Sequence, residues 1–364
     1  MSQVFLIASL VAFLITFSLT PLVAKFAKKF GLVDDPRHRP HPAHIHKGII
    51  PRAGGLAIYL GFVVTCLLFL PITKVLLGII GGATIIILIG LWDDRADLSP
   101  YFRFLTNFLA AGIVVGAGVG IPYITNPFGG VLRLDIWRIG FNFWGPHSIL
   151  VLADLFAIFW IVWCANIVNW SKGVDGQMPG FVAIAAATLG ILSFRFSAHD
   201  ISQWVVTALA FTTAGAFLGF LPWNFYPQKI MPGYGGGTLA GYLLAVLSIL
   251  SWGKLGTAIL VLGIPMIDAS YTIGRRIVQG KSPFRADRGH LHHKLLDLGW
   301  GKRRIALFYW LFSAILGVVA LTLTSQQKLF AIVLLAVIVG GALLWLNFFL
   351  LLPKRQDLDN GLKI

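Results

Sequence analysis

The sequence predicts an all-α polytopic membrane protein with about eleven transmembrane helices. Of its 364 residues, 57% are hydrophobic and only 12% are charged, whereas soluble domains carry about 25% charged residues. The mean hydropathy is +0.82, and apolar stretches recur at a length of roughly 20 residues, which crosses a hydrocarbon core of about 30 Å. We therefore expect a single integral membrane domain over residues 1–364, solvated by lipid.

The predicted spans follow one another along the chain. The first has no basic leading segment and no small-residue cleavage site, so we interpret it as a retained helix and not as a signal peptide. Cys66 and Cys164 both fall inside spans, which disfavours a structural disulfide. The spans are expected near 4–24, 53–72, 75–92, 105–122, 149–169, 181–196, 202–221, 236–252, 255–275, 305–324 and 328–352.

The Lys and Arg residues predict the orientation of these spans. Twenty-three of the 29 lie in one alternate set of loops and six lie in the other. Because basic residues favour the cytosolic side, we expect the N-terminus outside and the C-terminus in the cytosol. Because the basic residues follow the orientation of the spans, the net charge of +15 does not indicate a nucleic-acid partner. The expected cytosolic loops are 25–52, 93–104, 170–180, 222–235 and 276–304.

The longest connection on the expected external side is 123–148. Apolar and charged residues alternate over 132–136 between glycine-rich turns. A period of two residues is typical of a strand, so the sequence predicts a small external β-hairpin near 131–144.

The third span ends in two adjacent carboxylates, Asp93 and Asp94. Neighbouring carboxylates at a membrane boundary repel each other unless a cation or a shared proton neutralises them. A hard divalent ion such as Mg²⁺, with Mn²⁺ as a substitute, would take their oxygens and leave room for substrate phosphates. A solvated, Asp-rich helix end is the alternative.

The fifth span ends in Asn166 and Asn169, which share a helix face because they are three residues apart. Lys172 and Asp175 follow between glycines that let backbone N–H groups approach a ligand. This pattern suits a phosphate or a nucleotide, and a helix end capped by Asn and Gly is the alternative. A second glycine run, 233–237, opens the eighth span and either cradles an anion or forms a flexible turn.

The last cytosolic loop combines cations with histidines. Such a cluster forms a dense anion-binding surface whose histidines also shuttle protons or bind metal. A positive-inside anchor is the alternative, but an anchor needs no histidine. In the ninth span, Pro265 and Asp268 predict either a broken helix facing a polar cavity or a neutral buried carboxyl. The charged and histidine side chains of this loop include Arg285, Asp287, Arg288, His290, His292, His293 and Lys294.

Taken in order, these segments resemble the polyprenyl-phosphate N-acetylhexosamine-1-phosphate transferases, glycosyltransferase family 4, over nearly the whole chain. Asp93-Asp94 stands where the family has its Asp-Asp pair, and residues 51–55 stand where it has Pro-Arg-Leu-Gly-Gly. Residues 166–176 match Asn-Ala-Val-Asn-Leu-Ile-Asp-Gly-Leu-Asp-Gly. Residues 285–293 are similar to the Asp-Arg-x-His-x-His-His loop of the WecA and TagO branch. The related MraY enzymes carry a His-His-His-Phe-Glu type sequence there instead.

The resemblance implies transfer of an N-acetylhexosamine 1-phosphate from a UDP-amino sugar, first of all UDP-GlcNAc, to polyprenyl (undecaprenyl) phosphate. UMP is released, and the product starts a lipid-linked cell-envelope glycan. The implied location is the bacterial inner membrane, multi-pass, with the active site on the cytosolic face, and a homodimer is left open. Three alternatives remain: a phospho-MurNAc-pentapeptide transferase-like activity, a catalytically lapsed member, and a membrane transporter. A transporter would predict ionisable residues throughout the spans, whereas only Asp154, Asp268 and a few terminal groups lie there.

The resemblance also implies roles for individual residues. The implied catalytic residues are Asp93, Asp94, Asp175 and His290, and the implied metal ligands are Asp93, Asp94 and Asn169. The implied substrate-binding residues are Lys47, Arg52, Asn166, Lys172, Asn224, Arg285, Asp287, Arg288, His292 and His293.

Two positions depart from the family pattern. Lys172 replaces the first Asp of Asp-Gly-x-Asp-Gly, and Tyr234 replaces the metal-binding Asp of Gly-Asp-x-Gly-Ser. Losing a carboxylate ligand weakens Mg²⁺ binding because fewer hard oxygens remain. One hypothesis is an active, divergent branch in which the remaining Asp and Asn side chains hold the ion, and the other is a ligand-binding member without catalysis. We favour the active branch because the other clustered polar residues remain.

Overall fold

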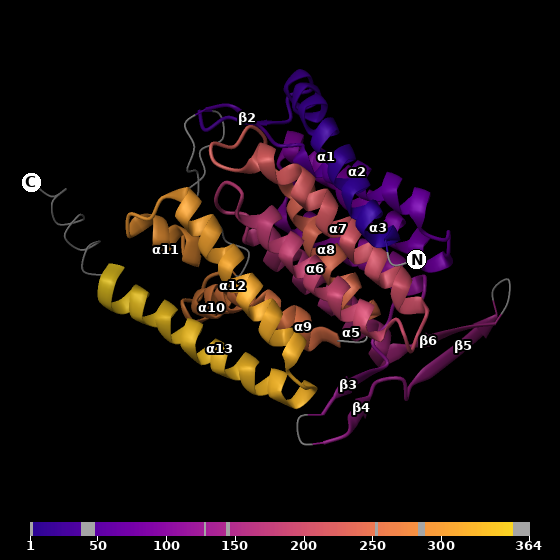
Figure 1. Cartoon of the computed structure of the whole chain (residues 1–364). Coiled ribbons are helices and arrows are strands. Elements are labelled where there is room, and N and C mark those ends of the chain that lie inside the picture. The colour runs from indigo at the N-terminus through magenta and orange to yellow at the C-terminus, as the bar shows by residue number, and fades with distance from the viewer. Residues whose placement is uncertain are drawn as a thin grey trace, which may run out of the picture.

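The computed structural model describes residues 3–37, 48–126, 129–142, 146–251, 254–282 and 288–351. Helices dominate this part of the chain (Figure 1), and the predicted all-α polytopic membrane fold is confirmed. Eight of the described helices are long and apolar enough to cross a membrane. They are α1 (Val4–Lys29), α3 (Lys74–Ala96), α5 (Val151–Trp170), α6 (Gln177–Phe196), α7 (Ser202–Asn224), α8 (Gly233–Leu250), α12 (Lys302–Thr322) and α13 (Ser325–Trp345).

The remaining predicted spans are helical but shorter or broken. Helices α2 (Gly54–Phe69) and α4 (Pro100–Gly116) have 16 and 17 residues. Helices α9 (Lys254–Val261) and α10 (Gly263–Val278) meet at 83° and make a ninth span if they are taken together. This bend is the expected broken helix. Pro265 follows the break, in the first turn of α10, where the missing N–H of proline is tolerated. A short helix, α11 (Leu291–Asp297), precedes α12, and a π-helical turn (Leu346–Leu351) extends α13.

Helix α8 lies at the centre of the bundle. It packs against α2, α3 and α5. Of the residues in its apolar segment, 89% are buried inside the protein, whereas the corresponding share for α13 is 6%. Glycines permit this close packing: a Cβ at Gly241 would clash with the Cys164 carbonyl of α5, and one at Gly90 would clash with the Gly235 backbone. Small residues of this kind let helix backbones approach closely in membranes. The first turn of α8 is thereby held against α3 and α5.

The connection between α4 and α5 differs from the predicted single hairpin near 131–144. Strand β4 (Val131–Arg133) pairs with β3 (Tyr123–Thr125), and β5 (Arg138–Asn142) pairs with β6 (Pro146–Leu150). Strands β4 and β5 fall within the predicted hairpin but pair with strands outside it, and residues 134–136 of the alternating segment form a bend and a turn. Gly129 and Gly130 have φ values of 118° and 76°, and this left-handed backbone lets the chain turn between β3 and β4.

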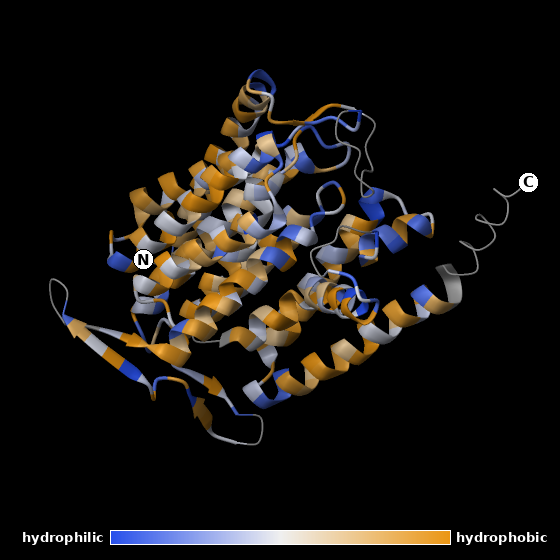
Figure 2. Ribbon diagram, turned by 180° about the vertical axis from the view of Figure 1, so that it is seen from behind, coloured by the Kyte–Doolittle hydropathy of each residue, from blue (hydrophilic) through white to orange (hydrophobic). Residues whose placement is uncertain are grey.

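The predicted cytosolic loops gather at one end of the bundle. There β1 (Val33–Asp34) pairs with β2 (Ile50–Pro51), and α11 lies at the same end, opposite β3 to β6 (Figure 1). Hydrophobic residues cover the middle of the bundle, and hydrophilic ones concentrate at the end that carries α11 (Figure 2). The orientation of this end toward the cytosol remains a prediction from the Lys and Arg residues.

Candidate active site

The two carboxylates at the end of α3 are buried and point to different partners. Asp93 is fully buried, and both of its oxygens lie 3.3 Å from Nη1 of Arg103 in α4. The backbone N–H of Leu98 also donates to Asp93, at 3.0 Å. Asp93 therefore joins the end of α3 to the connection with α4 and to α4 itself.

Asp94 faces the start of α8 instead. Its Oδ1 lies 3.2 Å from Nε of Arg52 and accepts the backbone N–H of Tyr234 at 3.1 Å. Asp94 is only 2% exposed. Burial lowers the pKa of Arg52, but Asp94 and further carboxylates outweigh it, so that this pKa lies above its ordinary value. Arg52 is therefore a permanent cation beside Asp94.

Backbone hydrogen bonds fix the segment that carries Arg52. The N–H groups of Gly54 and Gly55 donate to the carbonyls of Met231 and Pro232 at 3.0 and 2.9 Å. A Cβ at Gly54 would meet the Met231 carbonyl at 2.6 Å, so glycine is required for this approach. The start of α2 and the start of α8 are thereby held together.

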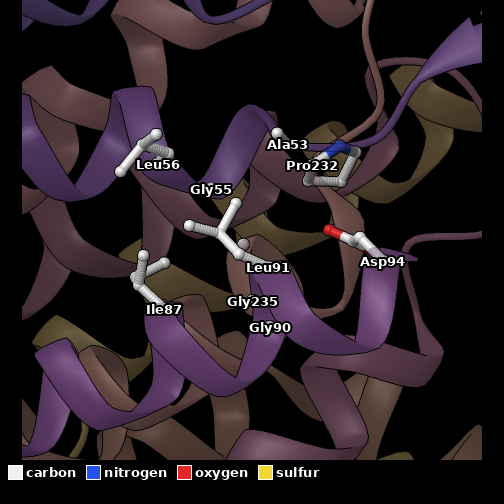
Figure 3. A pocket seen from close by; sticks show the side chains of 10 residues that line it. Ala53, Gly55, Leu56, Ile87, Gly90, Leu91, Asp94, Pro232 and Gly235 are labelled. Carbon is white, nitrogen blue, oxygen red and sulfur yellow. The ribbon is translucent and has the colours of Figure 1, made fainter. Parts of the chain in front are cut away.

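A narrow pocket opens between α2, α3 and α8. Asp94 lies at one end beside Pro232, and Leu56, Ile87 and Leu91 line the rest (Figure 3). The pocket therefore brings an apolar wall to a buried carboxylate.

Lys172 and Asn169 approach the same turn from the end of α5. The Nζ of Lys172 donates to the Gly233 carbonyl at 2.7 Å. Burial lowers the pKa of Lys172 to about 8, although the charge of Asp94 opposes this shift. The Oδ1 of Asn169 is buried without a hydrogen-bond partner among the described residues, and it lies against Gly237. Two sequence-predicted residues therefore join Asp94 and Arg52 at the start of α8.

Asp175 and Asn224 form a neighbouring cluster. Asp175 accepts Nζ of Lys302 at 3.1 Å and the N–H of Gln228 at 3.2 Å. Asn224 accepts the N–H of Gly176 at 3.1 Å, and its amide donates to the Ile230 carbonyl and the Gln228 side chain. The 172–176 segment is thus bound to the connection between α7 and α8.

The histidines of α11 lie on this same segment. A Cβ at Gly173 would clash with the imidazole of His292, so the ring packs directly on the glycine. Asp268 of α10, 1% exposed, accepts the N–H of Leu291 at 2.8 Å and lies 3.0 Å from Nδ1 of His290. The buried carboxylate of the broken span therefore fixes the start of α11.

Burial keeps the next two imidazoles neutral. Burial, with smaller contributions from the neighbouring histidines and Arg288, lowers the pKa of His292 well below 6.5 and the pKa of His293 to about 4. Both rings are at most 3% exposed. At neutral pH these imidazoles therefore donate or accept hydrogen bonds without carrying charge.

Tyr234 does not turn toward Lys172. Its hydroxyl lies 3.2 Å from both the Arg103 carbonyl and Oδ1 of Asn107, and the Arg103 guanidinium lies 5.4 Å from the centre of its ring. The side chain that replaces the expected carboxylate therefore packs toward α4.

The remaining sequence-predicted residues have other surroundings. Asn166 donates to the Val162 carbonyl of its own helix at 2.8 Å, and Arg288 pairs with Asp297 at 2.8 Å. The predictions for Lys47, Arg285 and Asp287 lie outside the described residues. The sequence analysis gave no site role to Arg103, Asp268 or Lys302, although it identified Asp268 as an intramembrane carboxylate.

The residues present do not fit the expected Mg²⁺ ion well. No group of three or more His, Cys, Asp or Glu side chains in the described ranges is arranged to hold a metal. A basic side chain already pairs with each carboxylate at the site: Arg103 with Asp93, Arg52 with Asp94 and Lys302 with Asp175. The unpartnered oxygen of Asn169 is one suitable donor, but one neutral oxygen is not enough for a divalent ion.

Comparison with known proteins shows where this arrangement belongs. The model of Glycosyl transferase family 4 matches residues 76–252. The "Probable undecaprenyl-phosphate N-acetylglucosaminyl 1-phosphate transferase" of Bacillus subtilis (strain 168) is 32% identical over 327 residues, covering 88% of this chain and 85% of that protein. The decaprenyl-phosphate N-acetylglucosaminephosphotransferase of Mycobacterium leprae (strain TN) is 30% identical, covering 92% of this chain and 88% of that protein.

A third relative is more distant but carries a similar name. The undecaprenyl-phosphate alpha-N-acetylglucosaminyl 1-phosphate transferase of Escherichia coli (strain K12) is 28% identical, covering 80% of this chain and 76% of that protein. The family match includes the end of α3, which carries Asp94, and the loop after α5, which carries Lys172 and Asp175. The chain is a multi-pass membrane sugar-phosphate transferase and belongs to glycosyltransferase family 4.

Proposed function

We propose that this chain transfers N-acetylglucosamine 1-phosphate from UDP-GlcNAc to a polyprenyl phosphate. An oxygen of the acceptor phosphate forms a bond to the sugar-linked phosphorus, and the bond from that phosphorus to the bridging oxygen breaks. The electron pair leaves with UMP, so charge balances and a lipid-linked diphosphate sugar remains. The observation that carries this proposal is the meeting of Arg52, Lys172 and Asp94 at the start of α8.

The charges of this cluster suit a reaction between two anions. Both substrates carry phosphate, and their approach requires cations that neutralise the charge of the transferred phosphoryl group. Arg52 and Lys172 supply these charges in a buried setting, where electrostatic interactions are stronger than in water. The neutral imidazoles of His292 and His293, docked on the neighbouring 172–176 segment, supply hydrogen bonds to the diphosphate.

The surroundings of the cluster support one substrate from lipid and one from water. Apolar side chains line the narrow pocket beside Asp94, so the carboxylate adjoins hydrocarbon, as the head group of a polyprenyl phosphate whose chain stays in the bilayer requires (Figure 3). The neighbouring cluster around Asp175 and Asn224 is built from polar loops that suit a nucleotide. With the excess of Lys and Arg in these loops, this supports a site on the cytosolic face of the bacterial inner membrane.

Purified full-length protein in nanodiscs, given UDP-GlcNAc and undecaprenyl phosphate, tests the proposal through UMP release and formation of the lipid product. We expect Asp94→Asn to lower turnover by about 100-fold, the scale of losing one group that stabilises transition-state charge. Asp135→Asn is the matched control, because Asp135 pairs with Arg133 on the exposed strand connection at the other end. Folded protein that binds UDP-GlcNAc but releases no UMP, from it or from other UDP-amino sugars, would support the catalytically lapsed member instead.

A further inference from the structure

The ammonium group of Lys172 and the carboxylate of Asp94 both lie against Gly233, at the start of α8. The Nζ of Lys172 is 2.7 Å from the carbonyl oxygen of Gly233. A Cβ on Gly233 would clash with Oδ2 of Asp94, so the carboxylate packs against the same glycine. Burial lowers the pKa of Lys172, and the negative charge of Asp94 opposes this shift. The ammonium group is therefore part of the site and not a surface charge.

A divalent ion would meet unfavourable charges here. Arg52 already pairs with Oδ1 of Asp94 at 3.2 Å and with Oδ1 of Asp34 at 3.9 Å, and Lys172 adds a second positive charge beside Asp94. The first turn of α8, with its N–H of Tyr234 donating to Asp94, adds the positive end of a helix dipole. The position that carries a metal ligand in the family resemblance is Tyr234, whose hydroxyl points toward Asn107 and α4.

We propose that Lys172 replaces a divalent cation beside Asp94, so that the chain's own ammonium and guanidinium groups hold the phosphates and no metal ion binds at this position. The inference rests on the proposed function. Lysine is a compact point charge that binds phosphate well. It neutralises charge on the leaving UMP oxygen, which is the task that a metal ion performs in other phosphoryl transfers. The buried oxygen of Asn169, next to Lys172 at the α8 turn, is then available to a substrate hydroxyl or amide.

Two measurements on the wild-type protein test this inference. The first is Mn²⁺ binding, followed by the loss of the free Mn²⁺ signal in electron paramagnetic resonance, with empty zwitterionic nanodiscs as the blank. The second is UMP release in EDTA compared with release in Mg²⁺. We expect no stoichiometric Mn²⁺ site and turnover in EDTA within about threefold of that in Mg²⁺.

Substitutions at Lys172 sharpen the test. Lys172→Ala should lower turnover by about 100-fold, with or without Mg²⁺. Lys172→Asp restores a carboxylate, so we expect it to gain Mn²⁺ binding and to require Mg²⁺ for any turnover. Lys74→Ala, an exposed lysine at the other end of α3, is the matched control. Melting temperature and size-exclusion profile identify variants that fail to fold, and the wild-type measurements need no variant.

The outcomes separate the inference from the proposed function. One Mn²⁺ bound to the wild type and lost in Asp94→Asn would overturn the inference, as would turnover that EDTA abolishes and Mg²⁺ restores. Either result leaves the proposed function intact. No UMP under any condition would contradict the proposed function, and Mn²⁺ binding would then still decide whether a metal site exists beside Asp94.

Discussion

Replacing Gly173 by alanine tests whether the α11 histidines act from the position that they occupy in the structure. The three atoms nearest to an added Cβ all belong to the His292 ring, and they lie well inside the 3.4–4 Å of an ordinary contact. The ring must therefore move by roughly 1 Å or more. Displacements of this size cost about 100-fold in rate when they misplace a group at the reacting centre. Overpacking of a tight contact also costs about 1–3 kcal/mol of stability.

We expect Gly173→Ala to lower the turnover of UMP release by about 100-fold and to lower the melting temperature modestly. Gly301→Ala is the matched control, because a Cβ there meets nothing within 4 Å. The double variant with His292→Ala separates the causes, since removal of the ring removes the clash and the two losses should not add. Gly173→Ala with wild-type turnover and wild-type stability would refute the docking of α11 on the 172–176 segment.

Three further perturbations address the surroundings of the site. Asp268→Asn removes the carboxylate charge next to His290, so we expect about tenfold lower turnover. Hydrogen exchange of the α11 amides should also become faster, and unchanged exchange would contradict this role. Tyr234→Phe leaves Oδ1 of Asn107 without the hydroxyl that donates to it, so the free energy of unfolding should fall by about 1–3 kcal/mol while turnover stays nearly unchanged. A loss of turnover without a loss of stability would instead show that the hydroxyl takes part in the reaction. The folded-state pKa of His293 lies below its ordinary value of 6.5, at about 4, because of burial and then of the Arg288 and His290 charges. The contribution of neutral His293 to the free energy of unfolding is therefore fully present above pH 6.5 and is lost as the pH decreases toward 4. Hydrogen exchange of residues 288–297, corrected for the intrinsic rate, should increase at pH 5 relative to pH 7.5.

The membrane architecture was predictable because it depends on local composition. Apolar runs of about 20 residues identify helices without knowledge of their neighbours, and all predicted spans are helical in the structure. The hairpin prediction was less complete because strand pairing is not local. Residues 131–133 pair backward with 123–125 and not with the strand that follows them, and alternation alone does not specify a partner.

The site was predictable where a motif holds several polar residues together in the sequence. Asp94, Lys172 and Arg52 each belong to such a motif, and the structure brings them to one turn of α8. Lys302 was missed because its partner, Asp175, is 127 residues away along the chain. The opposite orientations of Asp93 and Asp94 were also unpredictable, since adjacent residues on a helix differ by about 100° in direction and only tertiary packing decides what each meets.

The burial of α8 also has a consequence for biogenesis. Because 89% of the residues in its apolar segment are buried inside the protein, α8 gains little from contact with lipid. Its glycine-rich first turn also has weak intrinsic helix propensity. Its stable position depends on α2, α3 and α5, which the ribosome makes earlier and which enter the bilayer before it. We therefore expect the first turn of α8 to take its place only after the surrounding helices have been inserted, so that a chain arrested before residue 233 would carry Arg52, Asp94 and Lys172 without a formed site.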